Sequence, residues 1–230
     1  GQLFTKLTRE IIVAVRQGGR DADANYRLRL AIQKARDSNM PYDNIDRAIK
    51  RGSGESEGAM LVELALEGYG PGGAAIIVHA VSDNRNRTLQ DIRNIFSRHG
   101  GNLGDSGSVA WLFDTKGIIT VDASSLNKED LELKAIDAGA DDVKVEDGYI
   151  EIYTKPEDLE AVRKGLEHEK IPIASSGIST VPKAPVHLEE KAALTTLKLL
   201  EKLEELDDVD NVTSNVDFPD AIVEKYRSQP

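Results

Sequence analysis

The sequence predicts an α+β fold in three domains: an N-terminal three-helix domain, a discontinuous α/β domain, and a ferredoxin-like βαββαβ domain inserted into the second. Apolar residues recur at three- and four-residue steps in the first segment and at every second position from Val62, which marks a change from helices to strands. From Gly117 to about Ser176 the order of elements is that of a ferredoxin-like fold. The helix and strand that follow have no partners of their own, so we expect them to complete the sheet that begins at Leu61.

The first segment is expected to form three short helices. One apolar stripe extends from Leu3 to Val15, and Gly18-Gly19 ends that helix. A second helix is expected over about Asp23 to Asp37, and a third begins after Pro41, because proline is favourable in the first turn of a helix. Three helices joined by tight turns indicate a small bundle.

A Gly/Ser/Glu linker separates these helices from the first strands. Alternation over 62–67 and an apolar run over 74–81 predict two strands. Thr88 followed by Asp91 has the spacing of a capping box, which predicts that a helix opens at Thr88.

Val109, Trp111 and Phe113 alternate, which predicts a further strand. The remaining expected elements are strands 118–122, 142–146, 149–154, 172–176 or beyond and 211–216, and helices 127–138, 157–169 and 189–206. The domain boundaries that follow are 1–56 for the helical domain, 57–115 with 184–230 for the α/β domain, and 116–183 for the inserted domain.

Composition limits the class of protein. Of 230 residues, 40% are hydrophobic and 30% are charged, which is ordinary for a soluble protein. Without cysteine, disulfide scaffolds, cysteine zinc sites and thiol catalysis are excluded. No apolar run approaches the roughly 18 to 20 residues of a membrane span, and the N-terminus lacks the pattern of a signal peptide. We therefore expect a cytoplasmic protein without membrane contact, with a monomer favoured over an oligomer.

Charge is distributed unevenly along the chain. The net charge is −11, but residues 1–54 have a balance of +5 and the remainder −16. A basic element on an acidic body suggests docking on an anion such as nucleic acid, although chance and helix solubility explain the split equally well. At 100° per residue, Lys6, Arg9 and Arg16 lie within an arc of about 80° beside the apolar stripe. We expect this basic ridge to contact phosphate, and its replacement by glutamate to leave stability nearly unchanged.

No catalytic or cofactor motif stands out. Gly68 to Gly73 satisfies the string GxGxxG, but a strand follows instead of the helix that dinucleotide binding needs, so a hairpin turn is favoured. No nucleophile elbow or phosphate-binding P-loop occurs. The histidines lack metal-ligand spacing: His79, His99, His168 and His187. We expect no enzyme activity, metal, cofactor or small-molecule substrate.

The stretch from Ser82 to Thr88 allows two interpretations. Arg85 and Arg87 lie where a strand changes to a helix, and a helix start favours an anion such as phosphate. In the alternative, Asn84 and Asn86 cap the helix and the arginines pair with nearby acids. The chemistry of the residues leaves both interpretations open.

Two further segments also allow two interpretations. The acidic run from Glu201 to Asp210 is expected to be the solvated end of a helix, with an acidic protein-docking patch as the alternative. Tyr149 and Tyr153 lie on one face of a predicted strand, as in an RNA-recognition sheet, but two such tyrosines more often cover a core edge.

Several motifs, spread over nearly the whole chain, point to one family. They are Leu3-Phe4-Thr5-Lys6-Leu7, Asn39-Met40-Pro41, Glu67-Gly68-Tyr69-Gly70-Pro71-Gly72-Gly73, Asp83-Asn84-Arg85-Asn86-Arg87-Thr88, Gly100-Gly101-Asn102-Leu103-Gly104, Gly107-Ser108-Val109-Ala110 and Leu206-Asp207-Asp208-Val209-Asp210-Asn211-Val212. With these motifs the chain resembles the YebC family, which includes the PmpR-type regulators of bacteria and the mitochondrial translational activator of cytochrome c oxidase subunit I. Members usually begin with a basic segment containing Gly-His-Ser-Lys-Trp, and this sequence starts after it.

The resemblance implies a three-domain fold and no enzymatic activity. Some members are described as DNA-binding transcriptional regulators, and others as translation factors that act at the ribosome and help the synthesis of proline-rich stretches. DNA and ribosomal RNA are therefore competing partners, and a protein-interaction adaptor that uses the acidic body is the alternative of another class. The residues expected to contact nucleic acid are Lys6, Arg9, Arg16, Arg20, Arg27, Lys34, Arg47, Lys50, Arg51, Arg85, Arg87, Arg93 and Arg98.

Overall fold

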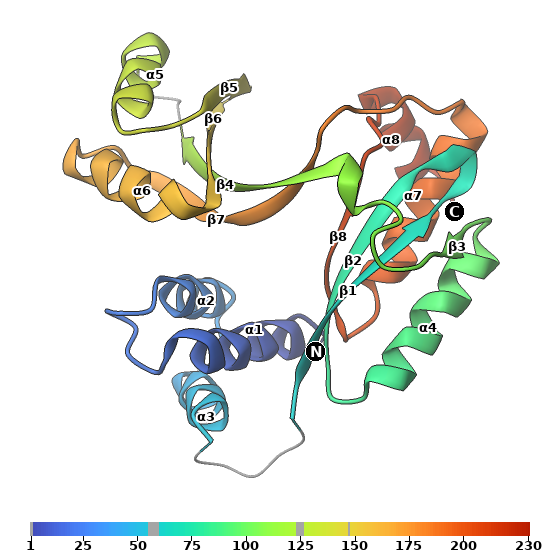
Figure 1. Cartoon of the computed structure of the whole chain (residues 1–230), viewed down its shortest axis with the longest axis horizontal. Helices are drawn as coiled ribbons and strands as arrows, with labels where there is room; N and C mark the ends of the chain where they lie inside the picture. Colours follow the sequence, from blue (N-terminus) through green and yellow to red (C-terminus); the bar gives the residue numbers. More distant parts are fainter. Residues whose placement is uncertain (1, 55–59, 123–126, 147) are drawn as a thin grey trace. The chain divides into compact units, whose positions relative to one another are not determined.

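The computed structural model describes residues 2–54, 60–122, 127–146 and 148–230. Contacts divide the chain into two compact units, Gly1–Leu112 with Pro182–Pro230, and Phe113–Val181. The first unit holds the helical and the discontinuous α/β domains, and the second is the inserted domain (Figure 1). The predicted α+β class is confirmed, with N-terminal helices and two antiparallel sheets. Among the described residues, no helix combines the length and apolar character that crossing a membrane requires.

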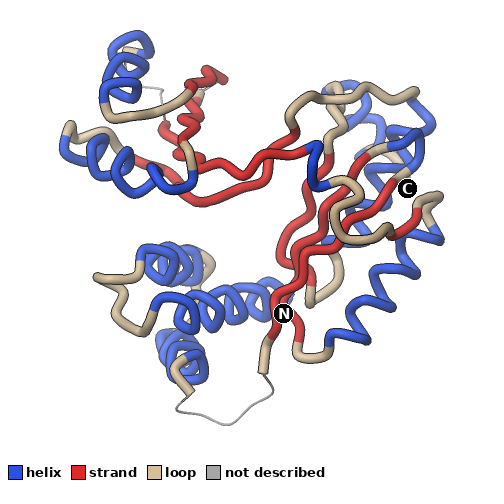
Figure 2. The backbone as a smooth tube through the Cα atoms, viewed as in Figure 1, coloured by secondary structure: helices blue, strands red, loops and turns tan. Residues whose placement is uncertain are grey.

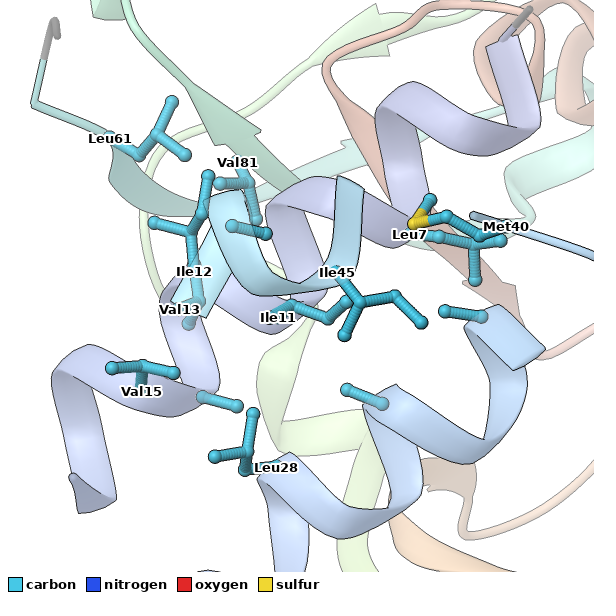
Figure 3. Packing of buried hydrophobic residues seen from close by; sticks show 14 residues of the cluster. Leu7, Ile11, Ile12, Val13, Val15, Leu28, Met40, Ile45, Leu61 and Val81 are labelled. Atoms are coloured by element: carbon cyan, nitrogen blue, oxygen red, sulfur yellow. The ribbon is translucent and has the colours of Figure 1, made fainter. Parts of the chain in front are cut away.

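Three helices surround one apolar core in the N-terminal domain. They are α1 (Gln2–Gly18), α2 (Tyr26–Asp37) and α3 (Tyr42–Gly52). Figure 3 shows Leu7, Ile11 and Ile45 in this core. The same core includes Leu61 and Val81 of the α/β domain, so the two domains share buried apolar surface.

Helix α2 begins at Tyr26, later than its periodicity predicts, because Asn25 caps it. The Asn25 side-chain oxygen accepts a hydrogen bond from the backbone N–H of Leu28 at 3.1 Å. Its amide group donates to the carbonyl oxygens of Ala14 and Gly19, both at 2.8 Å. Asn25 is buried, so these bonds satisfy a polar group and fix the turn between α1 and α2.

A four-stranded sheet of order β3-β1-β2-β8 forms the α/β domain. Its strands are β1 (Val62–Tyr69), β2 (Ala75–Ser82), β3 (Asn102–Leu103) and β8 (Val209–Ser214). Helices α4 (Arg85–Arg98) and α7 (Glu190–Glu204) pack on the same side of this sheet in a shared apolar core (Figure 1). Because β8 pairs with β2, the chain after the inserted domain completes the sheet, as predicted. Helix α8 (Asp220–Arg227) is an element that the sequence-based expectations lack.

The glycine-rich string between β1 and β2 is a hairpin turn, which confirms the expectation. Gly72 and Gly73 have φ values of +71° and +83°, in the region that glycine adopts without strain. The backbone N–H of Gly70 donates to the carbonyl oxygen of Ala74 at 2.8 Å. Only a 3₁₀ turn, Pro71–Gly73, separates β1 from the antiparallel β2, so no α-helix begins in this described segment to receive a pyrophosphate.

The strand expected at 109–113 is wrong: residues 110–112 form a short 3₁₀ turn, and β4 (Phe113–Asp122) begins after it. Glu67 explains the turn, since this buried carboxylate accepts three backbone N–H bonds at 2.6, 2.9 and 2.6 Å, from Gly107, Val109 and Ala110. Backbone donors bound to a carboxylate are not available to pair with a neighbouring strand.

The inserted domain has the predicted βαββαβ order. Its elements are β4, α5 (Lys128–Asp137), β5 (Asp142–Glu146), β6 (Tyr149–Thr154), α6 (Leu159–His168) and β7 (Ile173–Pro182). The strands form a second sheet of order β5-β6-β4-β7, traced in red with the first sheet in Figure 2. That order is the one that a ferredoxin-like connection of these elements gives.

Candidate nucleic-acid interface

The basic ridge of α1 is bonded to the α/β domain. The Lys6 ammonium donates to the carbonyl oxygen of Glu204, at the end of α7. The Arg16 guanidinium donates to the carbonyl oxygen of Leu61, just before β1. The ridge therefore donates hydrogen bonds to the backbone of the neighbouring domain and forms part of a domain junction.

Arg9 and Asp208 lie at the centre of this junction, with side chains 16% and 10% exposed. Arg9 Nη1 donates to Asp208 Oδ1 and, at 3.0 Å, to the carbonyl oxygen of Val81. Asp208 Oδ2 accepts from Arg87 Nη2 at 3.0 Å and from Thr88 Oγ1 at 2.5 Å. Burial alone would raise the pKa of Asp208, but the bonds from Thr88, Arg9 and Arg87 outweigh it and lower that pKa below its usual value.

The expectation that the run from Glu201 to Asp210 is a solvated helix end is therefore wrong at Asp208. Helix α7 ends at Glu204, and the chain then turns into β8, which buries Asp208. The sequence contains a signal of this, since the apolar residues Leu206 and Val209 interrupt the acids. A wholly solvated run would not need them.

Helix α4 begins at Arg85, and the capping box predicted for Thr88 and Asp91 is wrong. Asn84 is the N-cap: its side-chain oxygen accepts from the backbone N–H three residues further on, at 3.1 Å. Thr88 lies fully buried inside the helix, and its hydroxyl is 2.5 Å from Ser82 Oγ. Capping by Asn84, which the structural-turn interpretation includes, is confirmed.

Arg85 and Arg87 have different surroundings. Arg87 Nη2 pairs with Asp83 at 2.7 Å and with Asp208 at 3.0 Å. The bonds to Asp208 and Asp83 raise the pKa of Arg87, and the bond from Arg87 lowers the pKa of Asp83. Arg85 is exposed and has no hydrogen-bond or ion-pair partner in the described part of the chain. Arg87 thus braces the turn, whereas Arg85 leaves a free guanidinium beside a helix start.

The outer face of α4 is basic and has few acids. Ile92 and Phe96 are buried against the sheet, which turns the opposite side of the helix to solvent. Three exposed residues, hereafter the α4 arginines, have no side-chain partner among the residues described: Arg85, Arg93 and Arg98. Exposed amides lie between them: Asn86, Gln90 and Asn94. With Asp91 as its single acid, the helix has a net charge of +3.

Most other predicted residues of the helical domain are exposed and weakly paired. Four of them have a side-chain partner: Arg27 lies 3.2 Å from Glu63, Lys34 3.4 Å from Glu10, Lys50 2.9 Å from Asp46, and Arg47 2.6 Å from the Asn44 amide oxygen. Exposed ion pairs are worth only about 0–1 kcal/mol, so a phosphate can replace the acid. Arg20 is exposed and Arg51 half-buried. Arg36 on α2, which the predicted set lacks, is exposed without a side-chain partner in the described ranges.

The two tyrosines of β6 do not form an open stacking surface. Tyr153 is buried, and the ammonium groups of Lys116 and Lys144 lie 5.9 and 5.2 Å from the centre of its ring. Tyr149 is 41% exposed. Because the lysines cover Tyr153, the arrangement favours the core-edge interpretation over base stacking.

Comparisons with known proteins agree over the whole chain. Residues 1–55 match the model of the TACO1/YebC protein N-terminal domain, and residues 61–216 match that of the TACO1/YebC second and third domain. A probable transcriptional regulatory protein of Dehalococcoides mccartyi is 57% identical over 229 residues, which cover 100% of this chain and 91% of that protein. One from Chloroflexus aggregans is 51% identical and covers 99% and 92%. The crystal structure of a conserved hypothetical protein from Aquifex aeolicus has a TM-score of 0.87 at 48% identity, covering 96% of this chain and 91% of that chain.

The domain architecture and the names of these relatives place the chain in a class of three-domain α+β regulatory proteins. Within that class, the chain belongs to the TACO1/YebC family.

Proposed function

We propose that the protein is a non-enzymatic regulator of transcription that binds DNA in the cytoplasm through the outer face of α4. The observation that carries the proposal is the set of α4 arginines, three exposed guanidinium groups without partners in the described part of an acidic body. Phosphates attract such groups, and each contact releases counterions from the nucleic acid.

The amides of α4 favour duplex DNA as the ligand. An α-helix fits the major groove, where Asn and Gln recognise adenine and Arg recognises guanine. The exposed face of α4 presents these residue types together: Asn86, Gln90, Arg93, Asn94 and Arg98. Arg85 is exposed at the first residue of the helix, beside this face. The relatives named as probable transcriptional regulatory proteins support the same target.

The helical domain supplies a second contact surface in this proposal. Residues 1–54 have a charge balance of +5, and most basic side chains outside the α1 ridge are exposed on its surface. We exclude Lys6, Arg9 and Arg16 from the surface, because their donors bind the α/β domain. The proposed surface adds Arg36 and keeps six residues of the predicted set: Arg20, Arg27, Lys34, Arg47, Lys50 and Arg51.

A triple variant with Arg85, Arg93 and Arg98 changed to alanine tests the proposal. Its matched control replaces three lysines of α7, which lowers the charge equally on the other helix of the same domain: Lys191, Lys198 and Lys202. Binding to duplex DNA is measured by fluorescence anisotropy over a series of salt concentrations. The slope of log K against log salt is negative, and we expect its magnitude to decrease by about 0.9 per lost contact in the arginine variant only.

Three outcomes separate the alternatives. Equal losses in both variants would mean that net charge, and not the α4 face, determines binding. Stronger binding to ribosomal RNA or ribosomes than to DNA, lost in the same variant, would move the function to translation. Binding to a protein partner that is insensitive to salt, with no nucleic-acid binding, would favour the adaptor alternative and contradict the proposal.

A further inference from the structure

Asp208 lies where the two basic elements of the proposed interface meet. Its two carboxylate oxygens face different elements: Oδ1 accepts from Arg9 of α1, and Oδ2 accepts from Arg87 and Thr88 of α4. The Asp208 carbonyl oxygen also accepts the backbone N–H of Val81 at 2.8 Å. One residue is thus bonded to the helical domain, to the start of α4 and to the end of β2.

The partners of Asp208 are themselves held in place. Thr88 is fully buried, and its hydroxyl is within hydrogen-bond distance of Ser82 Oγ and of the Asn84 carbonyl oxygen, at 2.5 and 3.2 Å. Arg9 is bonded to a second carbonyl, that of Val81, at 3.0 Å. Because Asp208 is buried and ionised, water substitutes poorly for any of these bonds.

We propose that Asp208 is a positioning residue, which fixes the helical domain and α4 as one rigid nucleic-acid-binding surface. The inference rests on the proposed function, because it explains how the two elements proposed to contact nucleic acid, the helical domain and α4, are held in one orientation. Asp208 does not touch nucleic acid; it acts through Arg9 on one side and Arg87 on the other.

The physical consequence is a gain in effective concentration. When one element is bound, a rigid junction presents the other to the same duplex, whereas a loose junction must be ordered on binding and reduces the affinity. Asp208→Asn keeps the shape of the side chain but removes the charge that holds both arginines. We expect it to lower the affinity for a long duplex at least about tenfold, and that for a short duplex much less.

Distances within the protein test the positioning independently of binding. The chain has no cysteine, so Gln33→Cys on α2 and Ser97→Cys on α4 introduce two exposed spin-label sites only. Pulsed electron–electron double resonance between the two spin labels should give one narrow distance distribution in the double-cysteine protein. After Asp208→Asn, the distribution should be broad. The matched control is Asp83→Asn, which removes the exposed partner of Arg87 but leaves Arg9 bonded to Asp208, and should keep the narrow distribution.

A distribution as narrow after Asp208→Asn as before it would overturn the proposal. If that variant does not fold, Arg9→Gln breaks the same junction from the other side. The distance distributions before and after Arg9→Gln then test the proposal in the same way. A broadened distribution without loss of long-duplex affinity would also overturn it. A broadened distribution in a protein that binds no nucleic acid even before the change would uphold positioning but contradict the proposed function.

Discussion

The first and fourth helices both present arginines beside an apolar stripe, yet the structure treats the two basic faces in opposite ways. In α1, Arg9 and Arg16 donate to carbonyl oxygens of the α/β domain. In α4, Arg93 and Arg98 are exposed and have no partner among the residues described. Helical periodicity shows which side of a helix is basic, but the neighbouring domain determines whether that side meets solvent.

The largest expected difference between the two faces is in stability. Arg9→Ala leaves the buried Asp208 carboxylate without the more buried of its two arginine partners, and losing one member of a buried pair costs about 3 kcal/mol. Arg93→Ala removes an exposed side chain and should change stability by less than about 0.5 kcal/mol. Urea denaturation of both variants measures the difference. The predicted loss for Arg9→Ala contradicts the sequence-based expectation that changing the ridge hardly affects stability. Equal urea midpoints for the two variants would restore that expectation.

Acid should weaken the same junction. The pKa of Asp208 in the folded protein is below its usual value of 3.8, so its contribution to stability is complete above that value and is lost as the pH falls through the folded pKa. Asp208→Asn should therefore lower stability at pH 7 and reduce its loss below about pH 4. Urea midpoints at a series of pH values measure this, with the exposed Asp91→Asn as control. A decline as steep in Asp208→Asn as in the unchanged protein would exclude Asp208 as a source of acid sensitivity.

A smaller effect is expected at the start of α4. Asn84 is the side-chain N-cap of this helix, and replacing such a cap by alanine typically costs about 1 kcal/mol. Asn86, which is exposed and does not cap, provides the matched control as Asn86→Ala. Thermal denaturation compares the two variants. Equal melting temperatures would mean that the bonds of Thr88 fix the helix start without help from Asn84.

Most elements could be predicted from the sequence because their signals are local. The stripe of α1, the alternation of β1 and the order of elements in the inserted domain need only neighbouring residues. The strand expected at 109–113 is wrong because a distant residue intervenes. Glu67 binds backbone N–H groups some forty residues further along the chain and turns the expected strand at 109–113 into a 3₁₀ turn.

The candidate site was predictable only in part for the same reason. Arg87 pairs with Asp208, whereas Arg85 has no partner among the described residues. Because Asp208 is 121 residues from Arg87 along the chain, no local pattern in the sequence reports that contact. Arg36 was overlooked, although its exposure follows from its position outside the apolar stripe of α2. Helix α8 also has a local signal, since Pro219 precedes it in the position typical of a helix start.

The most direct test compares one arginine from each basic face in the same DNA-binding assay. Arg93→Ala on α4 and Arg16→Ala on α1 each remove one charge, and the slope of log K against log salt counts the phosphate contacts that are lost. Contact through α4 predicts that Arg93→Ala reduces the magnitude of this negative slope by about 0.9 and that Arg16→Ala leaves it unchanged. A reduced magnitude for Arg16→Ala together with an unchanged slope for Arg93→Ala would place nucleic acid on the α1 ridge and contradict the proposed interface.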